Sequence, residues 1–156
     1  WSWKKDREYG FPDVVDGVQV WAEPLVMHEQ LKYKAIIMLD GHDVATGLKW
    51  ALASNSVVMM TRPKFTSWTM EELLEPWVHY VPLIEDLTDV EEKMQWVIDN
   101  DADAHSIAIR GALWIEDLLY HPDAERDNLA IEEEILRRYA AHFFPPEQHP
   151  VPKGLP

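Results

Sequence analysis

Lys34-Ala35-Ile36-Ile37-Met38-Leu39-Asp40-Gly41 is the stretch that decides the fold. Its apolar run is short, contains β-branched residues and is followed by glycine, a pattern that predicts a buried strand of a parallel sheet. Apolar residues at helical spacing predict a helix over 43–54. A second buried strand is predicted at Val57–Met60. This order of strand, helix and strand is typical of parallel strands joined by a right-handed crossover.

The alternation continues toward the C-terminus. A short helix is predicted over 67–74, and Pro76 ends it. A third strand is predicted over 79–84, near an edge of the sheet because Pro82 has no amide hydrogen to donate. Three further helices are expected from apolar residues that recur every three or four positions: 90–98, 104–119 and 129–143.

Strands that alternate with helices predict an α/β fold, here a Rossmann-like, doubly wound parallel sheet. We expect an irregular lead-in at 1–30 with a short strand at Val18–Trp21, an α/β domain at 31–144, and an extended, proline-rich tail at 145–156. Thr88-Asp89-Val90-Glu91 matches a capping box, in which the Thr88 hydroxyl and Glu91 cap the helix that follows.

Composition excludes several classes of function. The chain of 156 residues carries 14 basic and 28 acidic residues, so its net charge of −14 argues against binding to nucleic acid or to anionic lipid. No apolar run reaches the roughly 18 residues of a membrane span. The absence of cysteine excludes a disulfide framework and a cysteine-ligated zinc site. Because the chain begins at Trp1 without a methionine, we expect a domain of a longer protein.

The most informative candidate site lies where the first buried strand meets the predicted helix. Free backbone amides and the helix dipole at such a junction bind anions. Gly41 and Gly47 permit close approach of the backbone, Thr46 offers a hydroxyl, and Lys49 offers a positive charge one turn further on. From the pattern alone, an ordinary turn between strand and helix is the alternative.

Other candidates each carry a structural alternative. Trp68 offers an aromatic face for a base or a sugar, but it equally fits a core position. His79 and Tyr80 are candidates for a nucleotide or sugar contact, or for a packing pair at a strand start. Glu71 and Glu72 fit either a contact to a sugar hydroxyl or a solvated helix face.

A metal site is not expected. Asp40, His42 and Asp43 lie within four residues and would share an ion only in a tight turn, and no matching ligands recur elsewhere.

The chain from about residue 29 to residue 111 resembles glycosyltransferase family 90, also called the CAP10-like or lipopolysaccharide-modifying family, which includes the protein O-glucosyltransferases. The matching residues follow one another in the family's order: Tyr33-Lys34, Asp40-Gly41, Lys49, Ser54-Asn55-Ser56-Val57-Val58, Leu74-Glu75-Pro76-Trp77-Val78-His79-Tyr80-Val81-Pro82, Asp86-Leu87-Thr88-Asp89 and the stretch 100–108. The Pro-Trp-Val-His-Tyr-Val-Pro segment is the most distinctive of these.

The resemblance implies that the chain is the C-terminal half of a GT-B glycosyltransferase, the half that holds most of the sugar-nucleotide donor. The implied donor site consists of the segment after the strand and of polar or aromatic residues near the cleft: Gly41, His42, Asp43, Val44, Ala45, Thr46, Gly47, Lys49, Ser56, Trp68, His79 and Tyr80. The family has Ser-Phe-Arg where this chain has Ala45-Thr46-Gly47, so Thr46 and Lys49 would replace the arginine in part.

The implied reaction is an inverting, metal-independent transfer of a hexose or pentose from a UDP-sugar to a hydroxyl of a glycan or protein. No cofactor is implied, and the general base is expected in a partner N-terminal half. The compartment would be the cytoplasm for a bacterial or viral protein and the secretory lumen for a eukaryotic one. The alternative is a catalytically silent Rossmann-like binding or scaffold module.

Overall fold

The computed structural model describes residues 14–19 and 22–143, which belong to two compact units, 1–33 and 34–156. In the first unit, β1 (Val14–Val15) and β2 (Val18–Gln19) form an antiparallel hairpin. Its turn, Asp16-Gly17, has positive φ at both residues, as two-residue hairpin turns require. A short helix, α1, spans Met27–Gln30. The strand predicted at Val18–Trp21 is confirmed for its first two residues, while Val20 and Trp21 lie outside the described residues.

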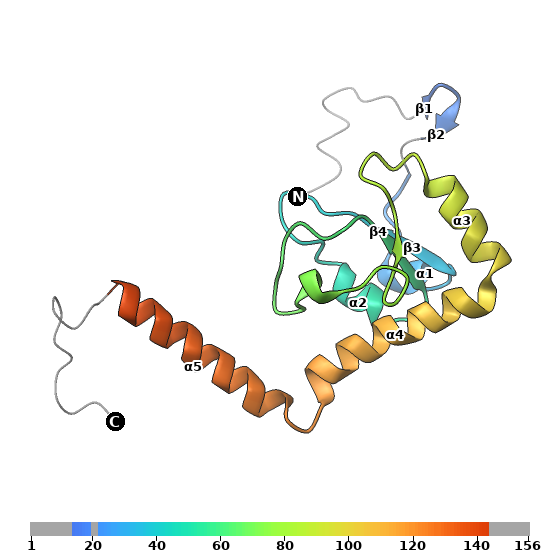
Figure 1. Ribbon diagram of the computed structural model, residues 1–156. Helices are drawn as coiled ribbons and strands as arrows, with labels where there is room; N and C mark the ends of the chain where they lie inside the picture. The colour runs from blue at the N-terminus through green and yellow to red at the C-terminus, as the bar shows by residue number, and fades with distance from the viewer. Residues whose placement is uncertain (1–13, 20–21, 144–156) are drawn as a thin grey trace, which may run out of the picture. The chain divides into compact units, whose positions relative to one another are not determined.

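The second unit contains a parallel sheet in the order β3-β4-β5 (Figure 1). The strands are β3 (Ala35–Met38), β4 (Val57–Met60) and β5 (Val81–Pro82). Ala35 pairs with Val57, and Pro82 pairs with Met60. The first two predicted strands are confirmed, and β5 lies at an edge as expected, although it is shorter than predicted. Trp77, with a φ of 63°, lies in the turn that leads to the strand.

Both faces of the sheet are covered, because side chains of β4 alternate between two cores. Val58 and Met60 pack with α2 (Leu48–Leu52) and with Ile115. On the other face, Val57 and Met59 pack with helices α3 and α4. Every residue of β4 is buried, as expected for a strand between two helical layers.

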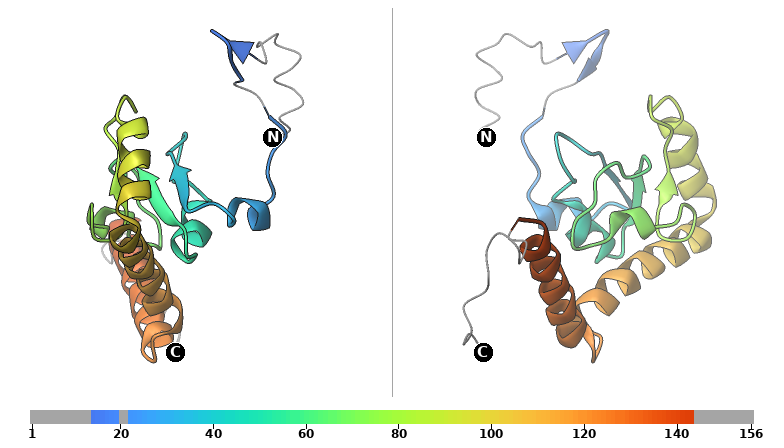
Figure 2. Two further views of the ribbon diagram at one scale, coloured as in Figure 1. Left: turned by 90° about the vertical axis from the view of Figure 1, so that its right-hand side faces the viewer. Right: turned by 60° about the vertical axis from the view of Figure 1, so that its left-hand side comes forward.

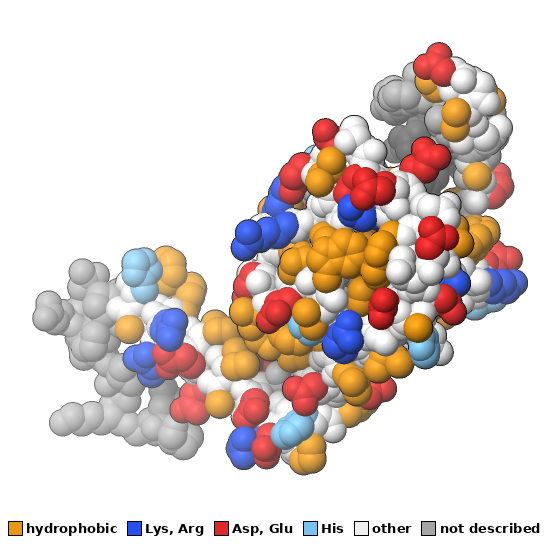
Figure 3. All heavy atoms as spheres, turned by 45° about the vertical axis from the view of Figure 1, so that its right-hand side comes forward, with side chains coloured by type: hydrophobic (Ala, Val, Ile, Leu, Met, Phe, Trp, Pro, Cys, Tyr) orange, Lys and Arg blue, Asp and Glu red, His pale blue; other side chains and the backbone are white. Residues whose placement is uncertain are grey.

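Three long helices complete the unit: α3 (Val90–Asp99), α4 (Asp101–Tyr120) and α5 (Ala124–Phe143). Figure 2 shows α3 and α4 along one side of the sheet. Gly111 lets α4 approach α2 and the segment before β5 closely, since a Cβ there would lie 3.0 Å from Leu52 Cδ2 and 3.1 Å from the His79 carbonyl oxygen. None of the helices in the described ranges is both long and apolar enough to cross a membrane. On the face shown in Figure 3, hydrophobic side chains gather near the middle, and acidic and basic side chains lie around them.

The two short predicted helices are wrong in length. Only Leu48–Leu52 of the helix predicted over 43–54 is helical, because Asp43 bonds the Val44 amide through its own carboxylate and favours a turn. Only Glu71–Leu73 of the helix predicted over 67–74 forms, as the 3₁₀ helix η2. Met70, with φ at 53°, prevents its extension toward the N-terminus.

The predicted capping box is also wrong. The Thr88 hydroxyl donates to Asp86 Oδ1 at 2.9 Å, and among the described residues no side-chain hydrogen bond caps the start of α3. Asp89 occupies the N-cap of α3 and accepts a bond from the Ile84 amide. Because Asp86 accepts from both the amide and the hydroxyl of Thr88, it holds Thr88 in the turn before the helix, and the N-cap falls one residue later than a capping box at Thr88 requires.

Candidate functional site

The carboxyl ends of the three parallel strands lie at one edge of the sheet, where α/β proteins bind their ligands. Residues that follow the three strands are connected there in a row. The Lys64 amide, after β4, donates to Asp40 Oδ2, after β3, at 3.1 Å. The Lys64 ammonium pairs with Glu85 Oε2, after β5, at 2.5 Å. We call this set the Asp40–Lys64–Glu85 row; the pairing with Glu85 raises the pKa of Lys64.

The predicted anion-binding segment forms a loop at the same edge. The Gly41 amide donates to the Asp43 carbonyl at 3.2 Å, and the Val44 amide donates to Asp43 Oδ1 at 2.8 Å. Two of the amides expected to bind an anion are therefore engaged inside the loop. Gly41, His42, Asp43 and Thr46 are exposed, whereas Val44, Ala45 and Gly47 are partly buried.

The helix that follows this loop adds little to an anion site. Helix α2 begins at Leu48 and has five residues, so its dipole is small. Gly47 does make a close approach, but to the chain itself: a Cβ there would lie 3.2 Å from Met38 Cε. This segment can therefore offer an anion mainly the polar groups of the loop, among them the exposed hydroxyl of Thr46.

Lys49 is partly buried and is paired with a buried carboxylate. Its ammonium pairs at 2.9 Å with Glu71 Oε1, and the Glu71 side chain is only 2% exposed. Ser67 donates to the same carboxylate from its amide (2.6 Å) and from its hydroxyl (2.7 Å). Burial raises the pKa of Glu71, but the hydrogen bonds from Ser67 and Lys49 outweigh it, so the pKa lies below its ordinary value. The solvated-face alternative is wrong for Glu71 and holds for Glu72, which is exposed.

This lowered pKa predicts how stability depends on pH. Ionised Glu71 contributes stability above its ordinary pKa of 4.5, and the contribution is lost as the pH falls through the lower pKa of the folded state. The difference in unfolding free energy between wild type and Glu71→Gln should therefore shrink between about pH 6 and about pH 3. Urea titrations at a series of pH values measure it, and a difference that stays constant over that range contradicts the assignment.

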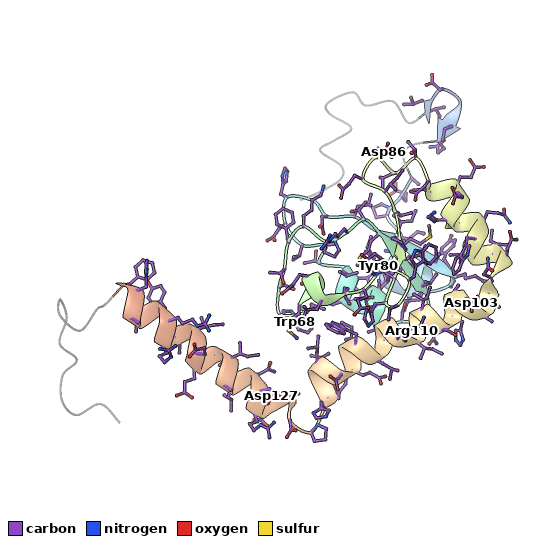
Figure 4. All side chains as sticks on the ribbon, viewed as in Figure 1. Trp68, Tyr80, Asp86, Asp103, Arg110 and Asp127 are labelled. Carbon is purple, nitrogen blue, oxygen red and sulfur yellow. The ribbon has the colours of Figure 1, made fainter. Side chains whose placement is uncertain are left out.

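Trp68 projects from a fixed segment, and its side chain is 56% exposed, so the core alternative is wrong. On one side, Ser67 is bonded to Glu71; on the other, Thr69 is fully buried and its carbonyl accepts from Trp114 Nε1 at 2.9 Å. Figure 4 shows Trp68 at the periphery beside η2 and Tyr80 in the interior. The chain thus holds an aromatic face toward solvent on an anchored backbone.

Ser56, His79 and Tyr80 lie apart from the 41–47 loop. Ser56 precedes β4 and is buried, so it belongs to the opposite, amino edge of the sheet. Tyr80 is a core residue beneath α2, and burial raises its pKa although the charge of Arg62 opposes this. The structure therefore brings 41–47 together at one edge and does not bring Ser56 or His79 to it.

His79 lines a groove along α4 instead. Its Nδ1 accepts from the Glu75 amide at 2.9 Å, its ring lies 5.2 Å from that of Trp114, and burial lowers its pKa. Arg110, which sequence reasoning missed, lies in the same groove and donates to the Val78 carbonyl at 2.8 Å. Its spacing of four residues from Trp114, which puts both on one helix face, is the signal that could have found it.

Lys64 was also missed by sequence reasoning, although it closely follows a buried strand, and residues in such positions meet at the edge of the sheet where ligands bind.

Among the residues of 14–19 and 22–143, no three His, Asp or Glu side chains gather closely enough to hold a metal ion. The carboxylate of Asp40 instead accepts a hydrogen bond from the Lys64 amide.

A parallel sheet of three strands that is covered on both faces by helices defines an α/β domain. The sequence profile described as Glycosyl transferase family 90 matches residues 16–126, and the chain belongs to this family.

Relatives include enzymes and viral proteins. The chain is 46% identical over 72 residues to the O-glucosyltransferase LpsA of Dichelobacter nodosus, covering 46% of this chain and 23% of that protein. It is 41% identical over 92 residues to protein O-glucosyltransferase 2 of Danio rerio, covering 56% and 18%. It is 38% identical over 91 residues to the uncharacterized protein 179R of Invertebrate iridescent virus 6, covering 54% and 8%. The matched region is less than a quarter of each of these relatives.

Proposed function

We propose that this chain is the donor-binding, C-terminal half of a GT-B glycosyltransferase that transfers a hexose or pentose from a UDP-sugar to a hydroxyl of a glycan or protein. The observation that carries the proposal is the family match over residues 16–126 together with relatives named O-glucosyltransferases. Those names make glucose the first sugar to test. A parallel sheet with polar loops at its carboxyl edge is a suitable frame for a nucleotide.

The chemistry assigned to this half is stabilisation of the leaving group. Negative charge grows on the diphosphate as the bond from its oxygen to the anomeric carbon breaks, and hydrogen-bond donors and cations placed there lower the barrier. The acceptor hydroxyl loses its proton to a general base, which we assign to the N-terminal half. The proposed transfer inverts the anomeric configuration and uses neither a metal nor a cofactor.

The second candidate is a catalytically silent binding module. Two observations favour it: Ala45-Thr46-Gly47 stands where the family has Ser-Phe-Arg, and the ammonium of Lys49 is paired with Glu71. Both remove positive charge from the predicted loop. Binding of UDP without turnover, even when the N-terminal half is supplied, would favour this candidate.

Calorimetric titration tests the donor site. The chain should bind UDP and UDP-glucose, should bind uridine more weakly, and should not hydrolyse UDP-glucose by itself. Thr46→Val should weaken UDP binding about three- to tenfold, because it removes one hydrogen-bonding hydroxyl without changing the side chain's shape. Ser106→Ala, at an exposed hydroxyl on α4 that bonds the Ala102 carbonyl, is the control. No binding of UDP contradicts the proposal, and unchanged binding by Thr46→Val removes Thr46 from the site.

A further inference from the structure

We infer that Lys64 is the cation that binds the diphosphate of the nucleotide donor, and that Glu85 forms an ion pair with Lys64 when no donor is bound. The inference rests on the proposed function and names the charged group of that same site. The carboxylate of Glu85 then acts as a resident anion, which the donor must displace.

The first support is position. Lys64 follows β4, the central strand, at the carboxyl edge of the sheet. Its amide is tied to Asp40 after β3, and its ammonium reaches Glu85 after β5, so it lies between the loops of all three strands. Pro63 restricts the backbone just before it. In Figure 4, Asp86, the neighbour of Glu85, is labelled on the segment between β5 and α3.

The second support is that other lysines of the described α/β unit are placed less well. Lys49 is paired with the buried carboxylate of Glu71 and is itself only 19% exposed. Lys34 precedes β3 at the amino edge and pairs with Asp101. Lys93 lies on α3 and pairs with Glu92. Of these four lysines, Lys64 is the one that lies at the carboxyl edge of the sheet and has an ammonium accessible to solvent.

The third support is that its ion pair is exchangeable. Lys64 and Glu85 side chains are each 59% exposed, and ion pairs this accessible contribute little to folding because solvent screens them. A diphosphate carries more charge than one carboxylate and offers several acceptor oxygens to one ammonium. The donor can therefore replace Glu85 without disturbing the backbone, which the Asp40 bond holds.

The two partners of this pair should change affinity in opposite directions. Lys64→Met should weaken UDP binding about tenfold, the size of one lost charge-assisted bond. Glu85→Gln should strengthen it about two- to fivefold, because the competing anion is gone. Uridine, which has no phosphate, should bind all variants alike. Calorimetry with UDP and uridine measures these changes, and thermal melts of each variant record folding.

Lys34→Met and Asp101→Asn are matched controls. They break an ion pair of 2.6 Å whose side chains are 51% and 72% exposed, at the opposite edge of the sheet. Both should leave UDP affinity within about twofold of wild type, as expected for an exposed pair remote from the ligand.

The outcomes separate the inference from the proposed function. If wild type binds UDP and Lys64→Met binds it equally, or if Lys64→Met and Glu85→Gln both weaken binding in step with lowered melting temperatures, the inference is overturned and the donor site stands. If wild type binds no UDP, the proposed function fails and the inference fails with it.

Discussion

Replacing Lys49 with methionine should lower the free energy of unfolding by about 3 kcal/mol, since removing one partner of a buried ion pair leaves an uncompensated charge. Glu71 is 2% exposed and keeps only the two bonds from Ser67 in this variant. The effect should be partly reversed in the double variant Lys49→Met/Glu71→Gln, because a neutral amide needs no counter-charge. Urea denaturation at neutral pH measures all three chains.

Lys34→Met provides the comparison, because its ion pair with Asp101 is exposed and its loss should change stability by less than about 1 kcal/mol. A Lys49→Met variant as stable as Lys34→Met would contradict the buried character of the Lys49–Glu71 pair. So would a double variant less stable than Lys49→Met alone.

Gly111→Val should destabilise the protein by about 2–3 kcal/mol, as overpacking of a tight contact does. The new Cβ would meet Leu52 Cδ2 at 3.0 Å and the His79 carbonyl oxygen at 3.1 Å. The leucine is packed in the core and the carbonyl belongs to the backbone, so neither moves without displacing α2 or the segment before β5. Thermal or urea unfolding measures the loss.

Ala102→Val is the matched variant, because it introduces the same side chain at an exposed position of the same helix. It should cost only the difference in helix propensity, about 0.5 kcal/mol. Equal stability of the two variants would contradict the prediction, because it would mean that α4 can move away from α2 at Gly111 without loss of stability.

The strands and long helices could be predicted because their signals are local. Val57–Met60 is a continuous apolar run, and α4 shows apolar residues every three or four positions over twenty residues. The bounds of the short helices could not be predicted, because a few local hydrogen bonds and backbone angles decide where these helices begin. Met70 in the left-handed region and the Asp43 bond to Val44 make them begin later in the chain than periodicity indicates.

The position of the candidate loop was predictable, whereas the partners of the charged residues around it were not. The junction after β3 does lie at the carboxyl edge of the sheet, as parallel topology requires. Which charges are accessible there depends on partners far away in sequence. The ammonium of Lys49 meets Glu71, 22 residues away, and the backbone amide of Lys64 meets Asp40, 24 residues away. No local pattern contains such pairings, so the buried lysine and the exposed one look alike in the sequence.

The central position of β4 has a consequence for cooperativity. Val58 and Met60 support one core, while Val57 and Met59 support the other. Neither helical layer can detach without uncovering this strand and weakening the layer behind it. The two sides of the sheet should therefore melt in one transition, and damage on either side lowers the stability of the whole α/β unit.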